Sequence, residues 1–409
     1  MIKMIKNGTL PFLLAIFPFI GIFLGEKYVP FLYILFALAL IFEKNKKVNL
    51  YSNKKVLFPF LIAIGVFITF TIISPDFKLA LKILERQISL LVIPFIIVVS
   101  KWNSSRIKIF IKIFISTTFF IGLYSIIKFS WFVVNNIDWA KHMAAEKGSM
   151  FLYLQYKFPH IIGVHPTYWS YLIISALIVL LSNKTLKVYK SKVWTIFLIS
   201  FLNINLIILA SRMPLLINLL IHLLFLVKYM KVNNVSLVKR LSLLFLLLTL
   251  FFVGAKLPLL SGKLDITKND ERIYHWPTAF KTISDNYFVL GEGLGQSNEV
   301  LRREVIKYGD ERIRYFGYDL HNQYLRQYMD MGILGIISLL ILLFYPFILN
   351  SEKVIYKNEI NISFLILFGL GLLSESFLYR LKGIVFFTVV SSFLYLRSVS
   401  FKKVDEHQD

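Results

Sequence analysis

Long uninterrupted blocks of apolar residues recur along the chain, and they constrain its fold more than any other feature. Many reach the length of about 17–25 residues that a helix needs to cross the hydrocarbon core of a bilayer. Backbone N–H and C=O groups cannot stay unpaired in lipid, so such blocks predict membrane-spanning helices. Only 17% of the 409 residues are charged, against about 25% in a typical soluble domain. We therefore predict an all-α, polytopic membrane protein.

The hydropathy pattern predicts about twelve transmembrane helices. The expected spans are residues 9–25, 28–43, 56–73, 86–100, 109–134, 167–182, 193–210, 214–230, 241–257, 332–349, 360–377 and 382–399. Arg86 and Pro94 interrupt the fourth. No small-residue cleavage site follows the first block, so we interpret it as a retained span rather than a cleaved signal.

Lysine and arginine collect in short linkers that all fall on one side of a twelve-span arrangement. These linkers are residues 44–55, 101–108, 183–192 and 228–240. Positive linkers mark the cytoplasmic side, so both termini are expected there. The formal net charge of +23 then reflects topology, and we expect no nucleic-acid partner.

The opposite, outer side holds a segment at 135–166 and the longest polar stretch of the chain, at 258–331. In the longer stretch, Asp and Glu closely match Lys and Arg, and aromatic residues are frequent. Mixed charge with many aromatics favours a folded subdomain over a tether. We expect short helices at about 272–284, 297–309 and 321–330.

Several kinds of chemistry have no matching motif. The sequence holds no HExxH, no His cluster at ligand spacing and no Walker loop, so we expect neither a metal nor a nucleotide cofactor. The absence of cysteine excludes thiol catalysis. The Gly-x-Gly-x-Gly run at 291–295 would need a preceding strand and a soluble sheet to bind a dinucleotide, so we interpret it as a turn.

Two arginines on the outer side are candidate anion-binding residues. Arg212 lies between two apolar blocks, where a guanidinium is costly unless it is paired. Its fork suits a phosphate, although a snorkelling topology anchor is the alternative. Arg272 begins an expected loop helix, and its alternative role is a surface ion pair with Asp270 or Glu271.

His321 lies directly before the tenth span and suits general-base work, because histidine changes protonation near neutral pH. An interfacial histidine in an aromatic belt is the alternative. Glu375 either neutralises an outer arginine or acts as the base instead of His321. The possible supporting residues are Arg86, His165, Tyr324, Arg326, Glu375 and Arg380.

Taken in order along the chain, these motifs resemble the O-antigen ligase superfamily. The resemblance rests on Ser211-Arg212, Arg272-x-x-x-Trp276, the stretch Asn286 to Gly293, His321-Asn322-x-Tyr324-Leu325, the Met331-Gly332 run and His165-Pro166-Thr167-Tyr168. Tyr287 replaces a proline that the family usually has. The best-matching stretch is about 195–345. The resemblance therefore divides the chain into three parts. These are N-terminal transmembrane helices at 1–194, a ligase-like core at 195–345 that contains the loop 258–331, and C-terminal transmembrane helices with the tail at 346–409.

The resemblance implies a membrane glycosyltransferase with a GT-C-like, all-helical architecture and a periplasmic loop domain. It implies an undecaprenyl diphosphate-linked glycan as donor, used without nucleotide or metal at the bacterial inner membrane. The resemblance implies that Arg212 and Arg272 bind the diphosphate and that His321 acts on the acceptor.

The acceptor separates three related activities. Transfer to lipid A–core makes an O-antigen ligase, transfer to another lipid-linked glycan makes a polymerase, and transfer to a protein hydroxyl is the third option. A lipid-linked sugar flippase is the rival from another class, but transporters place ionisable residues near the bilayer midplane. The sequence does not indicate an oligomeric state.

Overall fold

The computed structural model describes residues 2–41, 50–100, 102–138, 157–186, 188–209, 211–233, 236, 272–286, 289–307, 319–349 and 359–405. Within these ranges every regular element is a helix, and no strand occurs. The expected all-α class is confirmed.

A helix lies on each expected apolar segment except 241–257, which falls outside the described residues. The helices are α1 (Ile2–Phe23), α2 (Val29–Ile41), α3 (Leu50–Ile72), α5 (Ser89–Val99), α6 (Ser104–Asn135), α9 (Pro166–Leu181), α11 (Lys192–Leu209), α12 (Arg212–Val232), α17 (Gln323–Leu349), α18 (Glu359–Ser374) and α19 (Leu381–Asp405). In the described part of the chain, α3, α6, α11, α12 and α17 contain the 5 stretches that are long and apolar enough to cross a membrane. These helices indicate a multi-pass membrane protein.

The expected span 86–100 is divided in the structure. Helix α4 (Phe77–Gln87) begins well before it, and the 11-residue α5 follows after Ile88. The Asp76 side chain caps α4 by accepting a hydrogen bond from the Leu79 N–H at 2.9 Å. Helix α4 is amphipathic, so its polar residues lower its mean hydropathy. A hydropathy window therefore detects only α5, the apolar helix that follows.

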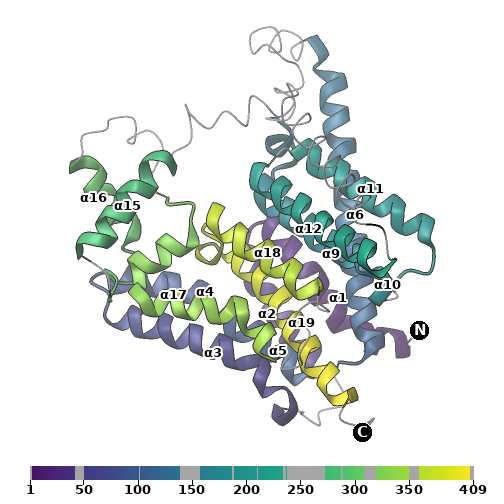
Figure 1. Ribbon diagram of the computed structural model, residues 1–409, viewed down its shortest axis with the longest axis horizontal. Coiled ribbons are helices and arrows are strands. Elements are labelled where there is room, and N and C mark those ends of the chain that lie inside the picture. The colour runs from purple at the N-terminus through teal and green to yellow at the C-terminus, as the bar shows by residue number, and fades with distance from the viewer. Residues whose placement is uncertain are drawn as a thin grey trace. The chain divides into compact units, whose positions relative to one another are not determined.

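The chain divides into two compact units. Unit 1 comprises residues 1–110, 270–355 and 368–409, and unit 2 comprises residues 111–269 and 356–367. In unit 1, α3 packs against α4, α5 and α17, and α19 packs against α1, α5 and α17 (Figure 1). In unit 2, α9 packs against α10 (Asn183–Leu186), α11 and α12. Almost every side chain of α9 is buried, so it is the core helix of that unit.

The expected loop helices are present in unit 1. Helix α15 (Arg272–Asn286), helix α16 (Ser297–Lys307) and the start of α17 lie at the predicted positions. They bury a common apolar cluster, with Trp276 and Ile283 packed against its edge. The cluster consists of Ala279, Val300, Leu301, Leu320, Leu325 and Met329.

Helix α17 bends sharply at Gly332, whose φ of 59° and ψ of −150° are not helical. The glycine run 291–295 packs against this bend: the N–H of Glu292 donates to the Met329 carbonyl at 2.8 Å and that of Gly293 to the Asp330 carbonyl at 3.0 Å. A Cβ on Gly291 would lie 2.3 Å from the Asp330 carbonyl carbon. The glycines therefore allow a close backbone approach that satisfies carbonyls at the bend.

Candidate functional site

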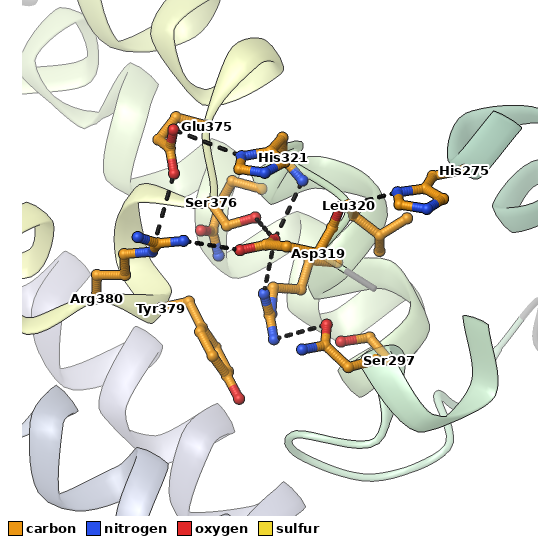
Figure 2. A network of polar contacts seen from close by, with 12 residues as sticks. His275, Ser297, Asp319, Leu320, His321, Glu375, Ser376, Tyr379 and Arg380 are labelled. Carbon is orange, nitrogen blue, oxygen red and sulfur yellow. Dashed lines mark hydrogen bonds and ion pairs between the residues drawn. The ribbon is translucent and has the colours of Figure 1, made fainter. Parts of the chain in front are cut away.

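The carboxylate of Asp319 lies at the centre of a polar network in unit 1 (Figure 2). One oxygen accepts hydrogen bonds from the His321 backbone N–H, an Arg326 guanidinium nitrogen and the Ser376 hydroxyl, each at 3.1 Å. The other oxygen accepts a hydrogen bond from Arg380 at 3.2 Å. Asp319 thereby joins the start of α17 to the connection between α18 and α19.

These contacts keep Asp319 ionised. Burial of the carboxyl opposes its ionisation, but the charges of Arg326 and His321, with hydrogen bonds from the His321 N–H and Arg380, outweigh burial and lower the pKa of Asp319 to about 2. The side chain is 22% exposed. A permanent negative charge at this position holds two cations in place around the histidine.

His321 has a φ of 44°, and it is the only described residue other than glycine with a positive φ. This left-handed backbone costs about 1–3 kcal/mol and persists only when neighbouring contacts enforce it. Asp319 binds the His321 N–H, and the Asn322 side chain caps α17 by accepting from the N–H groups of Tyr324 and Leu325 at 3.0 and 3.1 Å. The hydrogen bonds from the backbone to the side chains of Asp319 and Asn322 thus fix the direction in which His321 points.

The imidazole of His321 faces a buried carboxylate. Its Nδ1 lies 3.6 Å from Oε2 of Glu375, whose side chain is 3% exposed. The other oxygen of Glu375 lies 4.0 Å from Nε of Arg380. Figure 2 shows Glu375, His321 and Arg380 converging beside Asp319. A carboxylate at one ring nitrogen stabilises a protonated imidazole and leaves the other nitrogen to take up a proton.

Helix α15 anchors the segment that carries Asp319 and His321. The buried His275 donates from Nδ1 to the Asp319 carbonyl at 3.1 Å, and the Trp276 indole donates to the Leu320 carbonyl at 2.9 Å. The histidine of the site is therefore positioned by a neighbouring helix as well as by its own turn.

Arg326, one of the possible supporting residues, is buried in the structure. Its side chain is 1% exposed and lies over the Tyr379 ring, with the guanidinium carbon 3.1 Å from the ring centroid. A second nitrogen donates to the Asn298 side chain at 3.1 Å. Because Arg326 is buried between these groups, its guanidinium acts on Asp319 rather than on solvent.

Three other predicted residues donate to carbonyl groups of α18 and of the connection between α18 and α19. Arg272, the first residue of α15, donates to the Ser374 carbonyl at 3.1 Å. Arg86 donates to the carbonyl of Tyr379, in the short 3-10 helix η4 (Phe377–Tyr379), at 3.5 Å. The Tyr324 hydroxyl donates to the Gly369 carbonyl at 3.0 Å. Arginines at the C-terminal end of a helix are favourable, because that end carries partial negative charge.

Two predicted residues belong to unit 2 and are described separately from the network. Arg212 is the first residue of α12, directly after Ser211. His165 precedes α9, and its ring lies edge-on to Tyr168 with 5.3 Å between centroids. Both side chains are thus at helix N-termini.

Sequence reasoning did not single out several residues that organise the network. Asp319, Ser376 and Tyr379 are not among the site residues that the sequence predicts. Asp330 caps α16 from another helix, by accepting from the Ser297 N–H at 2.8 Å. An Asp two residues before a His at a helix start is the pattern of an Asx turn, and it could have marked Asp319.

The arrangement favours an anionic ligand beside a proton acceptor. Arg86 and Arg272 donate hydrogen bonds to backbone carbonyls rather than to a carboxylate, and Arg380 lies beside Asp319 and Glu375. Among the described residues, no group of three or more His, Asp and Glu side chains could hold a metal ion. Arginine supplies positive charge beside His321 that could neutralise an anion.

Comparison with known families identifies the segment that carries most of this site. The family described as O-antigen ligase matches residues 194–340, which include Arg212, Arg272, Asp319, His321 and Arg326. No curated protein matches the chain. The matched segment begins in α11 and ends beyond the bend of α17. The chain therefore carries a domain of the O-antigen ligase family at residues 194–340, within a helical membrane protein.

Proposed function

We propose that this protein is an O-antigen ligase, which transfers a glycan from undecaprenyl diphosphate to a hydroxyl group of lipid A–core. The observation that carries the proposal is the convergence of Glu375, Arg380 and Asp319 on His321, at the end of the segment that matches the family. Such a site combines a proton acceptor with fixed positive charge, as this transfer requires.

Departure of the diphosphate is the step that needs positive charge. As the bond between the anomeric carbon and the diphosphate oxygen breaks, negative charge grows on the leaving group. Guanidinium groups in fixed positions stabilise that charge through bidentate hydrogen bonds. We assign this role to Arg212 and Arg272. Each is the first residue of a helix, where backbone N–H groups and the helix dipole also favour an anion.

His321 is the proposed general base. It takes the proton of the acceptor hydroxyl as the oxygen attacks the anomeric carbon, so one C–O bond forms while the other breaks, with inversion. The Glu375 carboxylate stabilises the imidazolium that results. Glu375 is buried and also faces Arg380, so we assign it to positioning His321 rather than to contact with the acceptor.

The membrane arrangement that we propose follows the positive-inside rule. Lysine-rich linkers place both termini in the cytoplasm and the site on the periplasmic side of a bacterial inner membrane. The proposal includes about twelve spans and a GT-C-like architecture, and the 5 membrane-length apolar stretches in the described part of the chain support its multi-pass character. The lipid tail of the donor would then lie among the spans, with the diphosphate at headgroup depth.

Deletion of the gene in its host tests the proposal through the lipopolysaccharide that remains. We expect complete core without attached polymer, while lipid-linked polymer accumulates, and restoration by wild type but not by His321→Ala. Core that carries a single repeat would instead indicate the polymerase. Unchanged lipopolysaccharide with an altered glycoprotein would indicate transfer to protein.

A further inference from the structure

Helix α4 presents two exposed rows of side chains beside its buried row. Its buried row, Ala80, Ile83 and Gln87, faces unit 1. Lys78, Lys82 and Arg86 follow at a spacing of four residues and form an exposed cationic row, which also contains Glu85. Phe77, Leu81 and Ile88 form an exposed apolar row, 54%, 48% and 45% accessible. Apolar and cationic rows side by side are typical of a helix that lies in a membrane interface.

The position of α4 in the chain agrees with that pattern. The membrane-crossing stretch of α3 ends at Ile72, and α4 begins at Phe77. A connection this short keeps α4 at the membrane surface where α3 emerges. The glycine run covers its buried side: the Ser74 hydroxyl donates to the Leu294 carbonyl at 3.3 Å, and a Cβ on Gly295 would lie 2.4 Å from Ile83.

The C-terminal end of α4 adjoins the polar network. Gln87 and Arg86 donate hydrogen bonds to the carbonyls of Leu378 and Tyr379, next to Arg380. Lys78 and Lys82 thus continue a line of positive charge from the exposed start of α4 towards the site. Charges of this kind attract lipid phosphates at the membrane surface.

From these observations we propose that α4 is a docking surface for anionic lipid headgroups, with Phe77 and Leu81 inserted among the acyl chains and Lys78 and Lys82 bound to phosphate. Delivery of the lipid-linked donor along this surface to Arg86 rests on the proposed function. Binding of an anionic phospholipid does not rest on it.

The first test measures binding of phosphatidylglycerol to the detergent-purified full chain by native mass spectrometry, with phosphatidylcholine for comparison. The double variant Lys78→Gln/Lys82→Gln should bind phosphatidylglycerol at least about fivefold more weakly, because each basic residue near the headgroups contributes about that factor. The control Arg302→Gln/Arg303→Gln removes the same charge from exposed side chains of α16 and should bind as wild type does. Equal losses in both variants, or none in the first, would overturn the proposal.

The second test measures insertion directly. The chain contains no cysteine, so Leu81→Cys and Glu85→Cys each create one site for an environment-sensitive fluorophore. In nanodiscs with spin-labelled acyl chains, quenching should be clearly stronger at the Leu81→Cys position than at Glu85→Cys. Equal quenching would contradict insertion of the apolar row.

In a transfer assay, the Lys78→Gln/Lys82→Gln variant should raise the KM for donor with kcat unchanged. If wild type transfers no glycan yet binds lipid through α4, the proposed function fails and the docking surface stands.

Discussion

The Asp319 carboxylate accepts a hydrogen bond from the backbone N–H of His321 at 3.1 Å, and His321 holds a left-handed backbone with a φ of 44°. The same carboxylate binds Arg326 and Arg380. Because one side chain fixes both the turn of the histidine and the charges around it, changes at Asp319 should affect stability and activity together.

Replacing Asp319 with Asn should destabilise the protein markedly. The variant keeps the shape of the side chain but leaves the buried Arg326 guanidinium without its charge partner, a change that typically costs about 3–5 kcal/mol. Thermal unfolding in detergent measures the loss. Glu299→Gln is the control, since it breaks a carboxylate–arginine pair exposed on α16, worth about 0–1 kcal/mol. A similar unfolding temperature for both variants would contradict the role given to Asp319.

Stability should depend on acid pH through the same residue. The folded-state pKa of Asp319, about 2, lies below its ordinary value of 3.8. The ionised carboxylate therefore contributes stability that is fully present above pH 4 and is lost as the pH falls towards 2, on the order of 2 kcal/mol. The unfolding temperatures of wild type and Asp319→Asn should approach each other over this range. A constant difference from pH 6 to pH 2 would exclude this linkage.

His321 and Glu375 should differ in how strongly they affect catalysis. Loss of a general base typically lowers the rate by about 10²–10⁴-fold, so His321→Ala should lose kcat while its KM for donor changes little. Glu375→Gln removes the charge beside Nδ1 but keeps the base, and should lose about tenfold in kcat. Single-turnover transfer rates measure both. A larger loss in Glu375→Gln than in His321→Ala would make Glu375 the base.

Gly332 should tolerate no side chain. A Cβ there would lie 2.2 Å from the Val289 carbonyl oxygen, and the residue has a positive φ. Gly332→Ala should therefore destabilise the fold by on the order of 2–3 kcal/mol. Gly65→Ala is the control, because that helical glycine has open space around it, and alanine there should be neutral or stabilising by up to about 1 kcal/mol. Thermal unfolding of the two variants compares them directly.

The sequence predicted the elements whose signals are local. Apolar block length predicted the long helices, and the polar stretch before α17 predicted α15 and α16 within two residues of their observed ends. The interfacial helix α4 was missed because its apolar residues are spread over two rows and its mean hydropathy is low. The bend at Gly332 falls where the sequence separates the expected helix 321–330 from the expected span 332–349, but its cause, the approach of the glycine run, lies outside α17.

The polar network was only partly predictable for a related reason. His321, Glu375 and Arg380 stood out as ionisable residues beside apolar blocks, but Asp319 did not, because its partners Ser376 and Arg380 are distant in sequence. Ser376 lies 57 residues away and Arg380 lies 61 residues away. Burial also determines the role of Arg326, and a single sequence does not report burial of a charged side chain.

Glycan transfer by the purified protein is the decisive measurement for the proposed ligase activity. Wild type and the variants His321→Ala, Arg212→Ala and Arg272→Ala would be reconstituted in liposomes with undecaprenyl diphosphate-linked glycan, lipid A–core and EDTA. We expect transfer to core by wild type and its loss in all three folded variants. Full activity of His321→Ala, or no transfer to core by folded wild type, would contradict this expectation.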